Sequence, residues 1–122
     1  MTNKKSTSYI IAKQGGTEIF RTTNVGVENR GSDIVIRGHD TQEKQGFGIE
    51  INIDTPSGEQ QFQVGGVLRV IYRHEWNDLY ATRGTYNAYI EKGSRHVKLT
   101  FKLEFGNLDE IEGDVEVTIL HH

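Results

Sequence analysis

The hydrophobic pattern is clearest between residues 96 and 119, where every second residue is apolar in two consecutive runs. The first run ends at Phe105 and the second begins at Ile111, with a short polar connector between them. Alternation with a period of two predicts β-strands, each with one buried face and one solvent-exposed face. The short connector predicts an antiparallel hairpin, because a parallel crossover needs about a dozen residues or more.

Other parts of the chain repeat this pattern. Runs rich in β-branched and aromatic residues lie between turn sequences that contain glycine, asparagine or proline. No window combines a helical period with helix caps. We therefore predict extended segments at 8–12, 18–21, 23–28, 33–37, 47–54, 60–64, 67–76, 79–82, 85–90, 96–105 and 111–119, with turns or bends at 29–32, 55–58, 65–66 and 77–78.

About eight to ten short strands at regular spacing predict an all-β fold. The favoured architecture is an antiparallel β-sandwich, jelly-roll-like or similar, and the alternative is a small antiparallel β-barrel. The sandwich is preferred because a barrel of this size would need bends repeated more regularly than the glycines are. With 122 residues, the chain is expected to be a single β domain spanning 1–122. Residues 1–7 are polar and expected to be loose; the closing His121 and His122 resemble a tag remnant and are left out of site reasoning.

Composition narrows the function classes. The chain has 14 basic and 17 acidic residues and a net charge of -3, without a basic run, so we expect no nucleic-acid partner. It contains no cysteine, which excludes disulfides, thiol catalysis and cysteine-ligated metals. The apolar stretch after Lys4 and Lys5 is too short for a signal peptide, and no run reaches the length of a membrane span. We expect a soluble protein, cytoplasmic by default.

Three short motifs carry a resemblance to a known group of proteins. They are Ser57-Gly58, Arg83-Gly84-Thr85-Tyr86, and the closing run Ile111-Glu112-Gly113-Asp114-Val115-Glu116-Val117. On these motifs the chain resembles the small all-β domains found among bacterial surface proteins and lipoproteins. The resemblance implies an all-β fold and brings no activity or site residues. The lipoprotein cysteine of that group is missing from this sequence.

No motif points to catalysis. A nucleophile elbow, a P-loop, a dinucleotide fingerprint and a Ser-x-x-Lys motif are all missing, so we lean against an enzyme and expect no cofactor. His39-Asp40 lies in a predicted loop, where a histidine is most often solvated. His74-Glu75 has no second histidine at helical spacing, so we predict no metal site there.

Carboxylates alternate along the last predicted strand, which raises the question of a calcium site. Calcium ligands converge from loops, whereas alternate side chains of a strand lie about 7 Å apart. We predict instead that these carboxylates form exposed cross-strand pairs with lysines of the preceding strand. If Phe105 pairs with Ile111, Lys102 falls opposite Asp114 and Lys98 lies near Glu116.

The aromatic residues of the central segment are the best indication of a binding site. Tyr72, His74 and Trp76 share one face of the predicted strand 67–76, at its end. Amphipathic aromatic side chains are common where proteins bind sugars, peptides or other proteins. Core packing is the competing interpretation. The predicted ligand-binding residues are Tyr72, Arg73, His74, Trp76, Tyr80 and Tyr86.

These observations lead to three hypotheses about function. The first is a non-catalytic binding or assembly module for a carbohydrate, a peptide or a protein. The second is a β-barrel carrier of a small apolar ligand, which native mass spectrometry of the purified protein would detect. The third is a structural protein that self-associates through its edge strands, which sedimentation would reveal as a concentration-dependent mass.

Overall fold

The computed structural model describes residues 8–42, 44–91 and 96–118, and within these ranges the chain forms ten antiparallel strands and no helix. All ten belong to one sheet, in the order β2-β1-β10-β9-β8-β7-β5-β4-β3, with β6 paired to β8 beside this path. The strands are β1 (Tyr9–Gln14), β2 (Thr17–Thr22), β3 (Val25–Asn29), β4 (Asp33–His39), β5 (Gln45–Asn52), β6 (Gly58–Gln61), β7 (Leu68–His74), β8 (Asn77–Ile90), β9 (His96–Phe105) and β10 (Ile111–Thr118).

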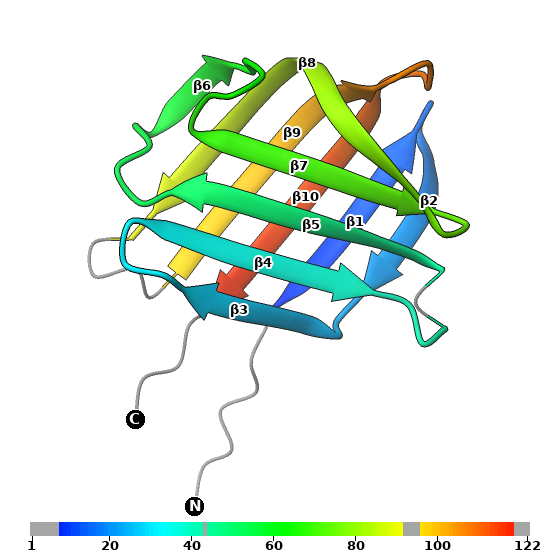
Figure 1. The fold of residues 1–122 in the computed structure, drawn as a ribbon, viewed down its shortest axis with the longest axis horizontal. Coiled ribbons are helices and arrows are strands. Elements are labelled where there is room, and N and C mark those ends of the chain that lie inside the picture. The colour runs from blue at the N-terminus through cyan, green and yellow to red at the C-terminus, as the bar shows by residue number, and fades with distance from the viewer. Residues whose placement is uncertain (1–7, 43, 92–95, 119–122) are drawn as a thin grey trace, which may run out of the picture.

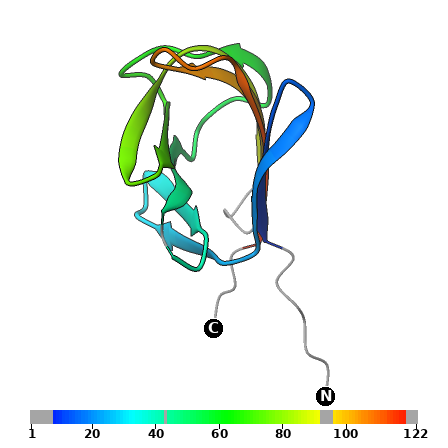
Figure 2. The same ribbon diagram turned by 90° about the vertical axis from the view of Figure 1, so that its right-hand side faces the viewer.

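The sheet curls on itself into a nearly closed barrel. Strands β3, β4, β5 and β7 form a front layer that runs across a back layer of β1, β9 and β10 (Figure 1). The view from the side shows the two layers facing each other, with the sheet continuing around one side between them (Figure 2). The all-β antiparallel prediction is confirmed, and the single continuous sheet corresponds to the barrel alternative rather than to the favoured sandwich.

Strand β8 joins the two layers and accounts for this difference. We predicted two strands, 79–82 and 85–90, but residues 77–90 form one strand of 14 residues. Its first part pairs with β7 in the front layer, and from Ala81 onward it pairs with β9 in the back layer. The register shifts between Ala81 and Arg83, which marks a bulge, and Gly84 follows with a φ of 137°. Bulges and glycines bend strands, so β8 turns the corner that a sandwich would divide into two sheets.

The predicted hairpin of residues 96–119 is confirmed in its strands and faces, over the part that the structure describes. Burial alternates along β9 and β10 as expected, with Val97, Leu99 and Val115 fully buried. The register assumed for the hairpin is wrong by two residues, because Ile111 pairs with Leu103 and not with Phe105. Lys102 therefore lies opposite Glu112 rather than Asp114, whereas Lys98 lies opposite Glu116, close to where it was expected. Periodicity assigns residues to a face, but it does not distinguish registers that differ by two.

Strand β7 ends earlier than predicted. The segment 67–76 was expected to stay extended up to a turn at 77–78, but β7 stops at His74, and the turn consists of Glu75 and Trp76. Both turn residues have positive φ, 48° and 72°. Two central residues of this kind make a type I′ hairpin turn, whose twist matches that of the strands it connects.

Aromatic side chains fill the space between the layers. Phe47 of β5 stacks on Tyr72 of β7, with ring centroids 4.8 Å apart. Across the barrel, the same ring lies 5.6 Å from Phe20, 6.1 Å from Phe101 and 6.2 Å from Phe105. One ring therefore contacts strands of both layers, which holds the front layer over the back layer.

Candidate functional site

The outer surface of the front layer carries rows of residues that the strand registers align. In one row, Arg37 on β4 lies opposite Gly48 on β5, and Gly48 lies opposite Ile71 on β7. Gly26 on β3 and Tyr80 on β8 complete this row at its two ends. The neighbouring row consists of His39, Gly46, Arg73 and Asp78.

A groove of about 500 Å³ follows β5 through these two rows. Gly46 and Gly48 form its floor, because neither has a side chain to fill the outer face of β5. A Cβ atom at Gly48 would meet nothing within 4 Å, whereas one at Gly46 would lie 2.6 Å from the carbonyl oxygen of Gly38. The walls stand on β4 and β7, two strand spacings or about 9.5 Å apart. The groove lining comprises Asn24, Gly26, Arg37, His39, Gly46, Phe47, Gly48, Ile71, Arg73 and Asp78.

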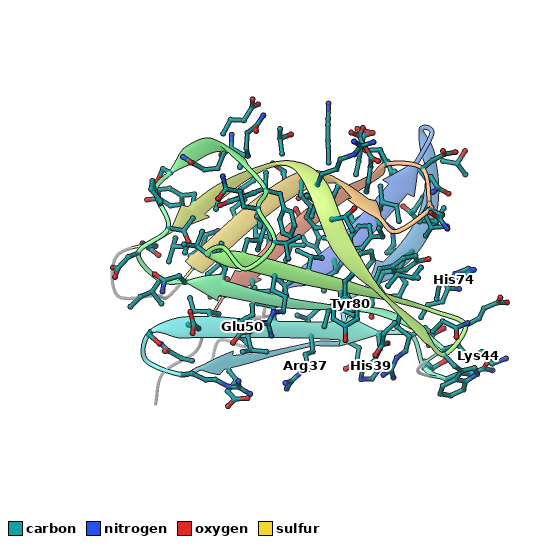
Figure 3. The ribbon with its side chains drawn as sticks, turned by 45° about the horizontal axis from the view of Figure 1, so that its top comes forward. Arg37, His39, Lys44, Glu50, His74 and Tyr80 are labelled. Carbon is teal, nitrogen blue, oxygen red and sulfur yellow. The ribbon has the colours of Figure 1, made fainter. Side chains whose placement is uncertain are left out.

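Side chains labelled in Figure 3 show how the two walls of this groove are placed. Arg37 and His39 lie along the β4 side, and Tyr80 lies over the β7–β8 side (Figure 3). Glu50 and Lys44 lie on opposite sides of this group, Glu50 farther along β5 and Lys44 at the β4–β5 connection. A carboxylate and a lysine thus lie on the same layer, on either side of the labelled groove residues.

Arginines supply the positive charge of this face. The guanidinium of Arg73 is bonded to Asp78, with Nε 2.9 Å from Oδ1, while Arg37 lies 3.9 Å from Glu28. Arg69 and Glu50 form a further pair at 3.5 Å. These groups are largely exposed, so each pair contributes about 0–1 kcal/mol to stability. By contrast, β1 and β9 on the back layer carry lysines, Lys13, Lys98 and Lys102.

The choice of arginine affects what the groove can bind. A guanidinium offers a planar fork of donors that matches a carboxylate and that also stacks on flat groups. Arg37 stands across the floor from Ile71, and Arg73 stands across it from His39. A ligand lying on β5 would therefore meet a planar cation on each wall.

His39 adds an imidazole ring to the β4 wall of the groove. Its Nδ1 lies 3.0 Å from the carbonyl oxygen of Asp40. Because a carbonyl oxygen only accepts, Nδ1 carries the proton in this bond, and Nε2 of the neutral ring can accept a hydrogen bond from a ligand.

Trp76 stands at the end of the same layer, in the β7–β8 turn. Its side chain is 62% exposed, and its backbone N–H donates to the carbonyl oxygen of Lys44 at 3.2 Å. A bulky residue with positive φ is strained, and type I′ turns favour glycine at this second central position. The chain thus holds its single tryptophan in solvent, in a conformation that costs stability.

We predict that Trp76→Gly raises the free energy of unfolding by about 0.5–1 kcal/mol, because it relieves this strain. Urea denaturation of the two proteins measures the difference. Asn77→Gly changes the neighbouring residue, which has no positive φ, and is expected to be destabilising or neutral. If Trp76→Gly lowered the free energy of unfolding instead, the contacts of the indole would stabilise the fold by more than the strained turn destabilises it.

The six residues predicted for the site fall into three places. Arg73, Trp76 and Tyr80 lie on the outer face or the turn at its end; Trp76 and Tyr80 are 62% and 58% exposed. Tyr72 is 3% exposed and belongs to the core. His74, the last residue of β7, is exposed at the edge of that core, with its Nδ1 3.2 Å from the Tyr72 hydroxyl. Tyr86 lies beyond the bend of β8, in the back layer.

Of the residues that line the groove, the sequence analysis selected only Arg73. Arg37, Gly46 and Gly48 are the most important of those that it missed. The spacing of Gly46 and Gly48 in the sequence could have indicated the groove, because glycines at alternate positions of a strand remove side chains from one face only. That spacing does not reveal which residues stand beside the gap. The partners on β4 and β7 follow from the register, which the alternation alone does not specify.

Burial raises the pKa of the Tyr72 hydroxyl above its usual value, and the negative charge of Glu75 raises it further. The folded state therefore keeps this proton to a higher pH than the unfolded chain does. Stability is fully present below the unfolded pKa of about 10 and falls as the pH rises from there through the folded pKa.

We predict that Tyr72→Phe makes unfolding free energies measured between about pH 9 and about pH 11 fall less steeply with pH. Tyr80→Phe, at an exposed position, is the matched control and should follow the wild-type slope. An unchanged slope in Tyr72→Phe would mean that other groups cause the alkaline loss.

Within residues 8–42, 44–91 and 96–118, no cluster of three or more histidine, aspartate or glutamate side chains could hold a metal ion. The same part of the chain has no helix of the length and hydrophobicity needed to cross a membrane. Comparisons with protein-family models, with curated proteins and with solved structures found no match.

Proposed function

We propose that this protein is a non-catalytic binding module whose ligand lies in the glycine-floored groove of the front layer. The observation that carries the proposal is the pair Gly46 and Gly48, which leaves the centre of an exposed sheet face without side chains. Polar and charged side chains stand on both sides of that gap. Strands rarely place glycine at their interior positions unless the backbone must be approached closely.

The groove suits an elongated ligand that carries a carboxylate or a flat group. The backbone of β5 is already paired with β4 and β7, so the ligand would be held by side chains rather than by an added strand. Arg37 and Arg73 supply the charged donors, and Ile71 and Tyr80 supply apolar contact. A peptide, a carbohydrate or a protein segment can meet these requirements.

Exposed aromatic residues support the same location. Tyr80 continues the row of Gly48 and Ile71, and Trp76 stands at the turn between the last two strands of that face. Tyrosine and tryptophan are enriched where proteins bind their partners, since they combine a large apolar area with a polar atom. An exposed tryptophan retained in a strained turn agrees with a role outside stability.

Glycan, peptide and protein arrays probed with labelled wild-type protein test the proposal. Gly48→Tyr places a β-forming side chain on the groove floor, where there is open space, and should abolish the array signals. Asn87→Tyr introduces the same side chain at an exposed position of the back layer and should preserve them. Signals that survive both Gly48→Tyr and Trp76→Gly would contradict the location of the site.

A further inference from the structure

A second hollow, of about 650 Å³, lies between β6 and β7, beyond the bend of β8. It is separate from the groove, because no residue lines both. Its volume falls within the range of about 300–1,000 Å³ that is usual for small-molecule sites. The lining residues are Pro56, Glu59, Gln60, Gln61, Gln63, Gly66, Val67, Leu68 and Tyr86.

Tyr86 is the deepest polar residue of this lining. It is 5% exposed, and along this part of β8 the buried Tyr86 and Ala88 alternate with the exposed Asn87 and Tyr89, so the side chain of Tyr86 belongs to the inner face. Gln60 is its cross-strand partner on β6 and lies on that same face. Burial raises the pKa of the Tyr86 hydroxyl, which therefore stays protonated and able to donate over the physiological range.

The hydroxyl of Tyr86 makes no hydrogen bond to any residue in the described ranges. Within those ranges, no completely buried side-chain oxygen or nitrogen lacks a partner, so this hydroxyl is not sealed in the core. An inward-facing side chain that lines the hollow can reach solvent there. The structure thus presents an unused donor and acceptor at the base of a cavity.

The rest of the lining is polar but almost uncharged. Gln60, Gln61 and Gln63 contribute amides, each of which can both donate and accept hydrogen bonds. Glu59 is the single charged side chain that lines the hollow within the described part of the chain. Val67, 45% exposed, adds apolar surface beside these groups. Sugar hydroxyls also donate and accept at the same atom, and their C–H faces pack on such apolar surface.

We infer that this hollow binds a neutral saccharide, with Tyr86 and Gln60 as hydrogen-bonding contacts. Among the residues that the structure describes, no lysine or arginine that would select an acidic ligand lines the hollow. Its amides and phenol match hydroxyl groups instead. The inference does not depend on the groove, since the two places lie in different parts of the sheet and differ in charge.

Saturation-transfer NMR with a panel of neutral di- and trisaccharides built from glucose, galactose and mannose tests this inference, and calorimetry gives the affinity of those that bind. Tyr86→Phe removes only the hydroxyl and should weaken binding about tenfold, as expected for one lost hydrogen bond. Its free energy of unfolding should stay unchanged, because the hydroxyl has no hydrogen-bonding partner among the described residues.

Tyr89→Phe is the matched control, since Tyr89 is on the same strand but 53% exposed and outside the lining. It should bind the saccharide as the wild type does, and so should Gly48→Tyr. Failure of the whole panel to show saturation transfer would overturn the inference. Equal saccharide affinities of Tyr86→Phe and the wild type would also overturn it. So would a preference for galacturonate oligomers over neutral oligosaccharides.

Discussion

Gly84→Ala is expected to lower the free energy of unfolding by about 3 kcal/mol or more, because alanine combines a strained backbone with a clash. Gly84 has a φ of 137°, where side chains other than glycine are rarely found. A Cβ atom there would overlap the carbonyl oxygen of Lys102 and lie 2.9 Å from the Cα atom of Leu103. Both contacts are backbone atoms of β9, so they cannot move without disturbing the β8–β9 pairing.

Urea denaturation measures this effect, and Gly48→Ala is the matched control. At Gly48 a Cβ atom meets nothing within 4 Å, and no positive φ applies. Since glycine inside a strand is less favourable than alanine, this control should be neutral or more stable by about 0.5–1 kcal/mol. If Gly84→Ala and Gly48→Ala had the same small effect on the free energy of unfolding, the bend of β8 would tolerate a Cβ atom at Gly84.

Gly113→Ala is expected to cost about 1–3 kcal/mol through overpacking. Gly113 of β10 lies opposite Phe101 of β9, and both face the core. The ring of Phe101 lies over the glycine, so that an added Cβ atom would overlap the ring carbons. The ring must rotate or the strands must separate, and Phe101 also packs against Phe105, with ring centroids 6.5 Å apart.

A double-mutant cycle with Phe101→Leu tests this packing. Each single substitution should destabilise the fold. The double variant should lose less than the sum, by about 0.5–3 kcal/mol, because the smaller leucine leaves room for the methyl group. Val115→Ala, at a fully buried position on the same strand that lies opposite Leu99, should add to Phe101→Leu with little coupling. Additive losses in the Gly113 cycle would show that the ring does not restrict this glycine.

The local hydrophobic periodicity was sufficient to locate the strands but not to predict how they pair. Alternation identified the two strands of the hairpin and their buried residues, such as Val97 and Leu99, because a half-buried strand must repeat every two residues. It misplaced the pairing of Ile111 by two positions, since such a shift keeps every side chain on its face. The turn at Glu75 and Trp76 was also missed, because neither residue usually adopts a positive φ.

The residues of the candidate site were likewise predictable from the sequence only in part. Trp76, Tyr80 and Arg73 were selected from the sequence because amphipathic residues were dense in their segment, and the structure places them on or beside one outer face. Tyr72 was selected on the same grounds and is in the core. Residue type cannot separate these cases, since a tyrosine serves equally in a core and at a surface.

By itself, the sequence determined that this chain is all-β and which residues of its clearest strands face inward, because alternation is a property of each strand alone. Only the tertiary structure decided that the strands form one nearly closed sheet and that Gly48 lies between Arg37 and Ile71. It also left the hydroxyl of Tyr86 without a hydrogen-bonding partner among residues 8–42, 44–91 and 96–118. These features depend on contacts between distant segments, and the bend of β8 at Gly84 brings those segments together.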